Sequence, residues 1–299
     1  MSQPGSIPRT KALTLTGHKG AVNVARFNSD GKYCLTGGQD RQIRLWKVDT
    51  GEKVVEFEGH ARDVLDLQVS PDNSRFASVG NDRAVFLWDV ATQRIIKKCD
   101  GHLHRINTVG FSPNSALFAS GSLDKTVRIW DNRSNSRRPV QQLEEATDSV
   151  TTLAFNDTEM LTGSADGFVR VYDMRQGQMT ADFTGSPVTS GAWSADNRCI
   201  LIGALDHTLR LFDRSNGTLL NHYEGHQSSQ FKMECCFSRS GAHVISGSED
   251  GAIWFWDILE ASRAQRVLAH SSIVTCVAYH PTESALLSSS SDGSVIIWR

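Results

Sequence analysis

The stretch GHLHRINTVGFSPNSALFASGSLDKTVRIWD, residues 101–131, decides the fold of this chain of 299 residues. Apolar and polar residues alternate in its segments INTVGFS, ALFASGS and TVRIW, which are separated by the turns SPNS and LDK. Alternation with a period of two, interrupted by turns of Asp, Ser and Pro, is typical of strands joined into hairpins. The stretch therefore predicts three antiparallel strands, and a fourth is expected near residues 140–143.

The same pattern recurs along the sequence with a period of about 42 residues. Each copy has an Asp on a polar or glycine-containing turn and an aromatic residue six positions later. The Asp residues are Asp40, Asp82, Asp124, Asp166, Asp206, Asp250 and Asp292, and the aromatic residues are Trp46, Trp88, Trp130, Tyr172, Phe212, Trp256 and Trp298. Five copies have a Gly-His or Ala-His pair 22 or 24 residues before the Asp, at His18, His60, His102, His226 and His270. Such repeats are the signature of four-stranded propeller blades.

These marks resemble the WD-repeat family, which implies an all-β fold, a seven-bladed β-propeller formed as one domain by residues 11–299. The last repeat ends at Arg299, after its third strand, whereas the segment KALTLT, residues 11–16, precedes the first Gly-His pair. An unpaired strand edge invites aggregation. We therefore expect the N-terminal strand to complete the last blade. Residues 1–10 are expected to form a disordered lead.

The recurring polar residues form a set that satisfies its own hydrogen bonds inside a blade. An indole N–H donates, a hydroxyl both accepts and donates, a neutral imidazole offers one donor and one acceptor, and a carboxylate accepts. Five repeats hold the complete set: His18, Thr36, Asp40 and Trp46; His60, Ser78, Asp82 and Trp88; His102, Ser120, Asp124 and Trp130; His226, Ser246, Asp250 and Trp256; His270, Ser288, Asp292 and Trp298. The fourth and fifth repeats lack it, and more apolar packing is expected there.

Composition and charge argue against several classes of protein. The 31 basic and 33 acidic residues give a net charge of −2, which provides no global field for nucleic acid or an anionic membrane. No apolar run has the length of a membrane span, and the first residues lack the apolar core of a signal peptide. The six cysteines show no CxxC pairing and are expected as small buried residues of a reduced intracellular protein. We expect the chain in cytoplasm and nucleus, without cofactor or metal.

Catalysis is a weaker interpretation of the same residues. A Ser, a His and an Asp resemble a nucleophilic triad, but a triad occurs once, beside an oxyanion hole and a substrate pocket. Here the set recurs five times and includes an aromatic residue that holds the hydroxyl. The Asp-Gly turns resemble fragments of a calcium loop, yet none supplies alternating Asp ligands with a distal Glu. We expect no enzyme, and keep a hydrolase with a Ser and a His near the channel as an alternative.

Several stretches outside the repeat marks are more specific. The strings RRPVQQLEEATDSVTTLAF, DGFVRVYDMRQGQ, LDHTLRLFDRSNGTLLNHYEGH, FKMECCFS and HVISGSEDGAIWFWD resemble the mitogen-activated protein kinase organizer family of seven-bladed WD-repeat proteins. This resemblance implies an interaction scaffold for components of a kinase cascade, together with membership of spliceosomal complexes. The partners it implies are proteins, and the chain is expected as a monomeric propeller within larger complexes.

Partner-binding residues are expected in loops, where binding residues of scaffolds concentrate. One face of a propeller carries the Asp turns and the loops that lead into the inner strands. The segment after His226 is two residues longer than in the other repeats, so QSSQFK is expected to bulge onto this face. The candidates there are Asp63, Arg105, Phe231, Lys232 and Glu249. The alternative for Phe231 is a place in the core, since large aromatic side chains are more often buried.

A second candidate surface is the loop NRSNSRRPV, residues 132–140, on the opposite face. Arg133, Arg137 and Arg138 are suited to phosphate or an acidic segment of a partner. The alternative is a solvated basic loop, because three charges do not make a nucleic-acid footprint. The strings WDNR at residues 130–133 and YDMR at residues 172–175 also resemble the WDxR element that docks propellers on the cullin-4 ligase adaptor. A substrate receptor of a ubiquitin ligase is therefore a further alternative.

Overall fold

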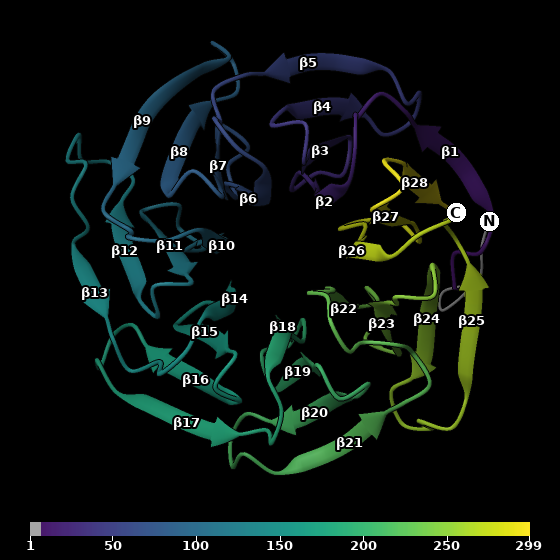
Figure 1. The fold of residues 1–299 in the computed structure, drawn as a ribbon. Coiled ribbons are helices and arrows are strands. Elements are labelled where there is room, and N and C mark those ends of the chain that lie inside the picture. The colour runs from purple at the N-terminus through teal and green to yellow at the C-terminus, as the bar shows by residue number, and fades with distance from the viewer. Residues whose placement is uncertain (1–6) are drawn as a thin grey trace.

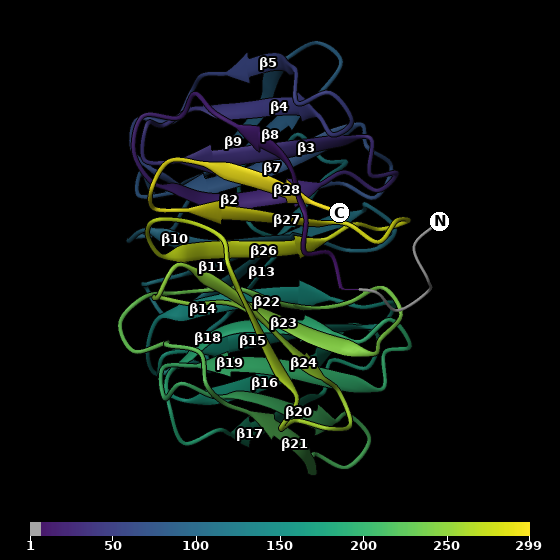
Figure 2. The same cartoon turned by 90° about the vertical axis from the view of Figure 1, so that its right-hand side faces the viewer.

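The chain forms seven four-stranded antiparallel sheets arranged in a ring around a central axis, in a computed structural model that describes residues 7–299 (Figure 1). Each sheet is one blade. In six blades the strands run in chain order from the central axis to the rim, whereas in the seventh the outer strand is the N-terminal strand of the chain. Figure 2 shows the ring from the side, with the strands of successive blades lying over one another in layers. The predicted all-β seven-bladed propeller is confirmed.

The blades are numbered by the order of their inner strands. Blade one contains β2 (Val22–Phe27), β3 (Tyr33–Gly38), β4 (Ile43–Lys47) and β5 (Lys53–Phe57), and blade two contains β6 (Val64–Val69), β7 (Arg75–Gly80), β8 (Ala84–Asp89) and β9 (Arg94–Asp100). Blade three contains β10 (Ile106–Phe111), β11 (Leu117–Ser122), β12 (Val127–Asp131) and β13 (Gln141–Leu143), and blade four contains β14 (Val150–Phe155), β15 (Glu159–Ser164), β16 (Phe168–Asp173) and β17 (Met179–Phe183).

The last three blades complete the ring. Blade five contains β18 (Val188–Trp193), β19 (Cys199–Ala204), β20 (Leu209–Asp213) and β21 (Leu219–Tyr223), and blade six contains β22 (Cys235–Phe237), β23 (His243–Gly247), β24 (Ala252–Asp257) and β25 (Ala264–Leu268). Blade seven contains β26 (Val274–Tyr279), β27 (Leu286–Ser290), β28 (Val295–Trp298) and, as its outer strand, β1 (Lys11–Leu15).

The N-terminal strand closes the ring, as expected from the sequence. β1 pairs antiparallel with β28, from Lys11 opposite Trp298 to Leu15 opposite Val295 (Figure 1). The pairing extends past the strand, because Thr10 and Arg299 exchange two backbone hydrogen bonds of 3.0 and 2.9 Å. Leu15 is buried in a cluster formed by blades seven and one.

The expected lead over residues 1–10 falls partly outside the described residues, which begin at Ile7. The described part contacts the propeller. Ile7 packs against the apolar cluster of blades six and seven, and Pro8 lines a small cavity there with Tyr279. Together with the Thr10 pairing, these contacts place residues 7–10 on the side of the ring.

The core lies between neighbouring blades, because each sheet presents alternate apolar side chains to the next sheet. Phe57 of blade one, for example, packs against Phe76 and Trp88 of blade two, whose own rings stack at 5.5 Å between centroids. Equivalent clusters fill the other gaps around the ring. All six cysteines are free, and four of them are buried.

The four-residue polar set is assembled in blades one, two and three. The Trp indole Nε1 lies 2.8–2.9 Å from the hydroxyl of Thr36, Ser78 or Ser120. The same hydroxyl lies 2.7–2.8 Å from the His Nε2, and the His Nδ1 lies 2.7–3.0 Å from the Asp carboxylate. Because a carboxylate only accepts, Nδ1 carries the proton and Nε2 accepts from the hydroxyl. The order is Trp, hydroxyl, His, Asp.

Blade seven uses a modified set. Trp298 Nε1 and His270 Nε2 both reach the hydroxyl of Ser288, at 2.9 and 2.7 Å. His270 Nδ1 contacts the hydroxyl of Ser294 at 2.8 Å, and that hydroxyl donates to Asp292 at 2.6 Å. The carboxylate of Asp292 is 3.5 Å from the imidazole, so Ser294 relays the interaction.

The set expected in blade six is wrong. Trp256 donates to the backbone carbonyl of Glu224, Ser246 donates to the carbonyl of Gly247, and Asp250 pairs with Arg266. His226 packs edge-on against the Trp256 ring, at 5.3 Å between centroids, but forms no hydrogen bond with any of these side chains, and its Nδ1 has no hydrogen-bond partner. The physical reason is the longer segment after His226, whose amides bond other groups. The Gln227 amide donates to Ser248, whereas in blades one, two, three and seven the amide after the histidine donates to the Asp of the set.

In blades four and five, which lack the histidine, the Asp forms an ion pair with an Arg, a pair that blade one also has, between Arg44 and Asp40, beside its histidine. Arg170 pairs with Asp166 at 2.9 Å and Arg210 pairs with Asp206, each four residues along the chain. The expected apolar replacement is therefore only part of the account, since the Asp turn keeps a charged partner. The pattern of an Arg four residues after the Asp is visible in the sequence.

Replacing Asp124 with Ala is expected to lower the free energy of unfolding by roughly 1–3 kcal/mol, since buried donors lose their acceptor. Burial alone would raise the pKa of Asp124, but hydrogen bonds from His102 and Thr126 outweigh it and hold the pKa well below its usual range. The measurement is chemical unfolding of the two proteins at pH 7. Asp100→Ala, at a largely exposed side chain, is the control and should change little. Equal losses for both variants would contradict the structural role of Asp124.

Candidate partner-binding surface

The loops of one face converge on the mouth of the central channel. This face, here called the Asp-turn face, carries the turns between the second and third strands and the connections that lead into the inner strands. Hydrogen bonds join the two kinds of loop within a blade, as between Asn81 N and Asp63 O at 3.0 Å and between Leu123 N and Arg105 O at 3.0 Å. The loops therefore support one another around the channel.

A cavity of about 430 Å³ occupies this mouth. Blades one, two, three, six and seven contribute side chains to it. Its lining residues are Ala21, Asn23, Gln39, Asp63, Leu65, Arg105, Asn107, Gln230, Phe231, Lys232, Glu234, Thr275 and Ser291. Four residues proposed from the sequence, Asp63, Arg105, Phe231 and Lys232, are thus brought together although they come from three blades.

Phe231 is exposed at the edge of this cavity, with 47 % of its surface accessible. The interpretation of Phe231 as a core residue is therefore wrong. The reason is that the backbone of the loop before β22 is held by the Glu249 carboxylate. The amides of Ser229, Gln230 and Phe231 donate to the same oxygen of Glu249 at 2.7, 2.7 and 3.2 Å. With the backbone fixed in this way, the Phe231 ring stays on the surface.

Glu249 was expected from the sequence to bind a partner, but it holds this loop instead. Its carboxylate also accepts from the Ser229 hydroxyl at 3.0 Å, so both oxygens are used within the chain. Burial tends to raise the pKa of Glu249, but the backbone hydrogen bonds prevail and lower it. Glu249 is therefore an ionised anchor for the loop that carries Phe231.

The charged residues of the mouth differ in how firmly they are held. Lys232 Nζ reaches across to the backbone carbonyl of Asn107 in blade three, at 3.0 Å. The Asp63 carboxylate accepts from the side-chain amide of Asn81 at 3.1 Å. Arg105 is exposed, and its guanidinium makes no hydrogen bond to any residue of the described chain. The mouth thus offers an aromatic ring and a guanidinium that are both accessible to a partner.

Below the mouth, an ionic network crosses the channel. Arg26 of blade one forms a two-pronged pair with Glu234 before β22, one contact being 2.7 Å, and reaches Asp66 of blade two at 3.2 Å. The other oxygen of Asp66 accepts from the Val109 amide of blade three at 3.1 Å. The Cys276 thiol of blade seven lies 3.0 Å from Glu234. Five blades are therefore connected through charged or hydrogen-bonding groups that the sequence analysis did not single out.

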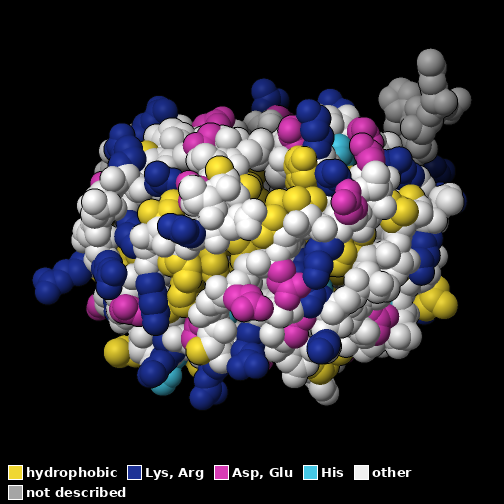
Figure 3. All heavy atoms as spheres, turned by 90° about the horizontal axis from the view of Figure 1, so that it is seen from above, with side chains coloured by type: hydrophobic (Ala, Val, Ile, Leu, Met, Phe, Trp, Pro, Cys, Tyr) yellow, Lys and Arg dark blue, Asp and Glu magenta, His cyan; other side chains and the backbone are white. Residues whose placement is uncertain are grey.

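The basic loop, residues 132–140, lies between β12 and β13 and therefore on the opposite face. Its base is fixed, since the Asn132 side chain bonds both the Ser115 carbonyl and the Arg75 guanidinium. Arg133, Arg137 and Arg138 are exposed, and Arg133 comes no closer than 3.9 Å to Asp131. These three arginines share no site with Phe231. On the rim seen in Figure 3, side chains of both charges are interspersed.

The hydroxyls of the polar sets are unsuited to attack a substrate. Thr36, Ser78, Ser120 and Ser288 have none of their surface accessible, and each accepts an indole N–H. Within residues 7–299, no three or more His, Cys, Asp or Glu side chains are grouped to hold a metal ion. The same residues include no helix that is long and apolar enough to cross a membrane.

Comparison with known proteins places these features among WD-repeat propellers. Residues 61–256 match the family described as nucleolar protein 10-like, N-terminal domain, and residues 9–47 and 262–299 match the WD domain, G-beta repeat. WD repeat domain-containing protein 83 of Rattus norvegicus is 55 % identical over 98 % of this chain and 93 % of its own length. The Homo sapiens protein of that name is 51 % identical over 99 % and 94 %. A Dictyostelium discoideum homolog of it is 30 % identical over 95 % and 96 %.

Proposed function

Because the chain belongs to the family of WD repeat domain-containing protein 83, we propose that it is a non-enzymatic scaffold that organises components of a kinase cascade and takes part in pre-mRNA splicing. The observation that carries the scaffold role is the channel mouth, where Phe231 and Arg105 are both exposed. The kinase and splicing parts rest on the sequence resemblance of blades four to six. On this proposal the protein acts in both the cytoplasm and the nucleus.

The mouth has the composition of a protein-binding site. Aromatic and Arg side chains are enriched among the residues that contribute most to binding, with surrounding contacts that exclude water. Here Phe231, Arg105 and Lys232 line the same cavity, and Asp63 supplies the opposite charge. The loop beneath Phe231 is already ordered by Glu249, so little conformational entropy is lost when a partner binds.

The proposal is tested by affinity purification of the tagged full chain from nuclear and cytoplasmic extracts, with partners identified by mass spectrometry. Recovery of kinase-cascade components and splicing factors supports it. Recovery of the cullin-4 adaptor in their place supports the second candidate, a substrate receptor of a ubiquitin ligase. That candidate is favoured by the exposed Arg133 and Arg175, which complete the two WDxR-like strings. Recovery of neither set contradicts both.

Changing Phe231 and Arg105 together to Ala is expected to weaken capture of the principal partner by about 2 kcal/mol or more, roughly 30-fold. The thermal midpoint should stay unchanged, since both side chains are exposed in the free chain. Binding of the purified partner is measured by calorimetry. Leu259→Ala with Arg263→Ala is the matched control, because it removes an exposed apolar and an exposed basic side chain elsewhere.

Two outcomes would contradict this assignment. A lower thermal midpoint for the double variant would mean that Phe231 stabilises the fold. Unchanged binding with unchanged stability would place the site elsewhere. In that case Arg133, Arg137 and Arg138 changed together to Ala are the next test, and the loss is expected chiefly for an acidic or phosphorylated partner.

A further inference from the structure

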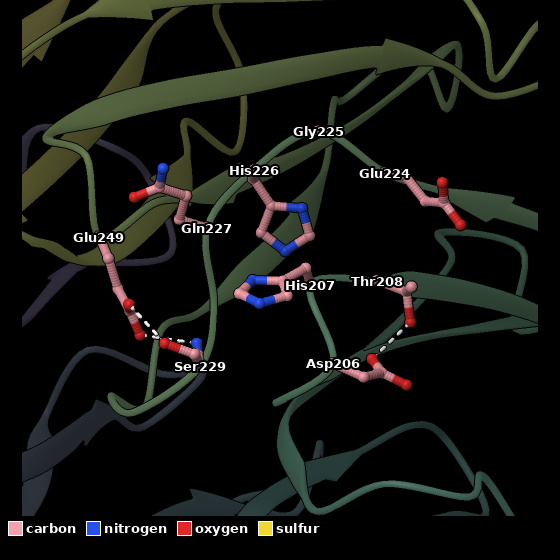
Figure 4. Close-up of a pocket in the computed structure, with 9 residues that line it drawn as sticks. All are labelled: Asp206, His207, Thr208, Glu224, Gly225, His226, Gln227, Ser229 and Glu249. Atoms are coloured by element: carbon pink, nitrogen blue, oxygen red, sulfur yellow. Dashed lines mark hydrogen bonds between the residues drawn. The ribbon is translucent and has the colours of Figure 1, made fainter.

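A second cavity, of about 620 Å³, lies on the Asp-turn face between blades five and six (Figure 4). Its lining residues are Asp206, His207, Thr208, Glu224, Gly225, His226, Gln227, Ser229 and Glu249. The loop before β22 separates it from the channel mouth, since Ser229 lines this cavity whereas Phe231 and Lys232 line the other. The two cavities are therefore neighbours with different linings.

His226 is the unusual residue of this cavity. Only 3 % of its surface is accessible, its Nδ1 is buried without a partner, and neither ring nitrogen bonds another residue of the described chain. In blades one, two, three and seven the equivalent histidine uses both nitrogens. A buried polar group without a partner costs free energy that a ligand recovers by bonding it.

The ring is neutral at physiological pH. Burial, with a smaller contribution from His207, lowers the pKa of His226 to about 4. A neutral imidazole presents one donor and one acceptor nitrogen. Figure 4 shows the ring of His207 facing that of His226 inside the cavity. His207 Nδ1 accepts from the Ser228 amide at 2.9 Å, so its position is fixed by the same loop.

The cavity is acidic. Three carboxylates line it, those of Asp206, Glu224 and Glu249, and no Lys or Arg is among the lining residues. Asp206 is paired with Arg210, and Glu249 is held by the loop amides. Glu224 remains available, because its side chain is 66 % exposed and the imidazole of His222 lies 3.8 Å from its carboxylate, beyond hydrogen-bond distance. The occupant favoured by this lining is a cation with several N–H donors.

We propose that this cavity is a socket for a basic side chain, Lys or Arg, of a bound protein partner. Glu224 supplies the charge, and the acceptor nitrogen of His226 receives an N–H, since the acceptor nitrogen of His207 is already used by the Ser228 amide. A metal ion fits less well, since two of the three carboxylates are already bonded and no metal-holding group of three exists among residues 7–299. The inference that this side chain belongs to a protein partner rests on the proposed function. The inference that the cavity binds a basic group does not.

The experiment uses small probes on the full chain, so it needs no identified partner. Nα-acetyl-arginine amide and Nα-acetyl-lysine amide are titrated while the histidine ring resonances are followed by NMR. Nα-acetyl-citrulline amide, which has the shape of the arginine probe without its charge, is the control. We expect saturable shifts of His226 and His207 with an affinity on the order of millimolar, as for other small fragments. The ring resonances of His60 should not shift, and added salt should weaken binding of the basic probes.

Glu224→Gln is the informative variant, because its side chain is exposed and the change leaves the fold intact. It is expected to weaken binding of the basic probes at least 3-fold. Glu52→Gln, at a carboxylate that is 63 % exposed on blade one, removes the same charge and should have no effect. A difference between the arginine and lysine probes would identify which basic side chain fits better.

Three outcomes would overturn the proposal. Equal binding of the citrulline probe would show that shape and not charge is recognised. Shifts of both rings by Zn²⁺ alone, at concentrations where the basic probes have no effect, would indicate a metal site. No shift at probe concentrations of about 50 mM, well above the expected affinity, would remove the socket. A negative probe titration does not affect the outcome of the affinity purification. A negative affinity purification does not affect the expected binding of the basic probes to this cavity.

Discussion

Removal of residues 1–16 is expected to lower the free energy of unfolding by about 3 kcal/mol or more and to produce aggregating protein. This segment contains β1, the outer strand of blade seven, so its loss leaves β28 as an exposed edge. The buried Leu15 contributes roughly 1.5–3 kcal/mol by itself. The pairing of Thr10 with Arg299 is lost as well.

The matched truncation removes residues 1–8 and keeps β1. Only a small loss is expected, because Ile7 is partly buried and the strand pairing is retained. Thermal unfolding and light scattering of both truncations give the comparison. Equal midpoints for the two proteins would mean that closure by β1 does not stabilise the ring.

Replacing Arg26 with Met is expected to destabilise the protein by roughly 3–5 kcal/mol at pH 7, because it leaves two carboxylates uncompensated in the channel. Burial would raise the pKa of Glu234, but Arg26 outweighs it and lowers the pKa to about 2. Burial raises the pKa of Asp66 in spite of Arg26. The arginine therefore keeps at least Glu234 ionised inside the ring.

The pH dependence of the Arg26→Met variant provides a second readout. Without the arginine, burial should raise the folded-state pKa of Glu234 above its unfolded value. A carboxyl of that kind is stabilising while protonated, so the variant should lose stability as the pH rises from about 5 to 8. Chemical unfolding across this range measures the effect. The double variant Arg26→Met with Glu234→Gln should recover part of the loss, and a double variant no more stable than the single one would contradict the network.

Much of the fold was predictable because a repeat makes the same local choice many times. The spacing from His102 to Asp124 and Trp130 indicates one blade, and its recurrence fixes the number of blades. Ring closure followed from a strand present before the first repeat and missing after the last. Such inferences require only local alternation and the rule that strand edges are paired.

The parts that the sequence did not reveal depend on where distant residues meet. Arg26 and Glu234 are 208 residues apart, and nothing in either repeat indicates that they pair across the channel. The extra residues after His226 were visible, and they correctly indicated the bulge that exposes Phe231. The loss of the polar set in blade six was not foreseen, because it depends on which groups then bind the loop amides.

The measurement that tests the central claim most directly is hydrogen exchange of the full chain, free and bound to its principal partner. If the channel mouth is the binding surface, protection should appear in residues 227–232 and beside Asp63 and Arg105. The rim strands β17 and β21 should exchange as in the free protein. Protection confined to residues 132–140 or to the rim, with the mouth unchanged, would contradict the account.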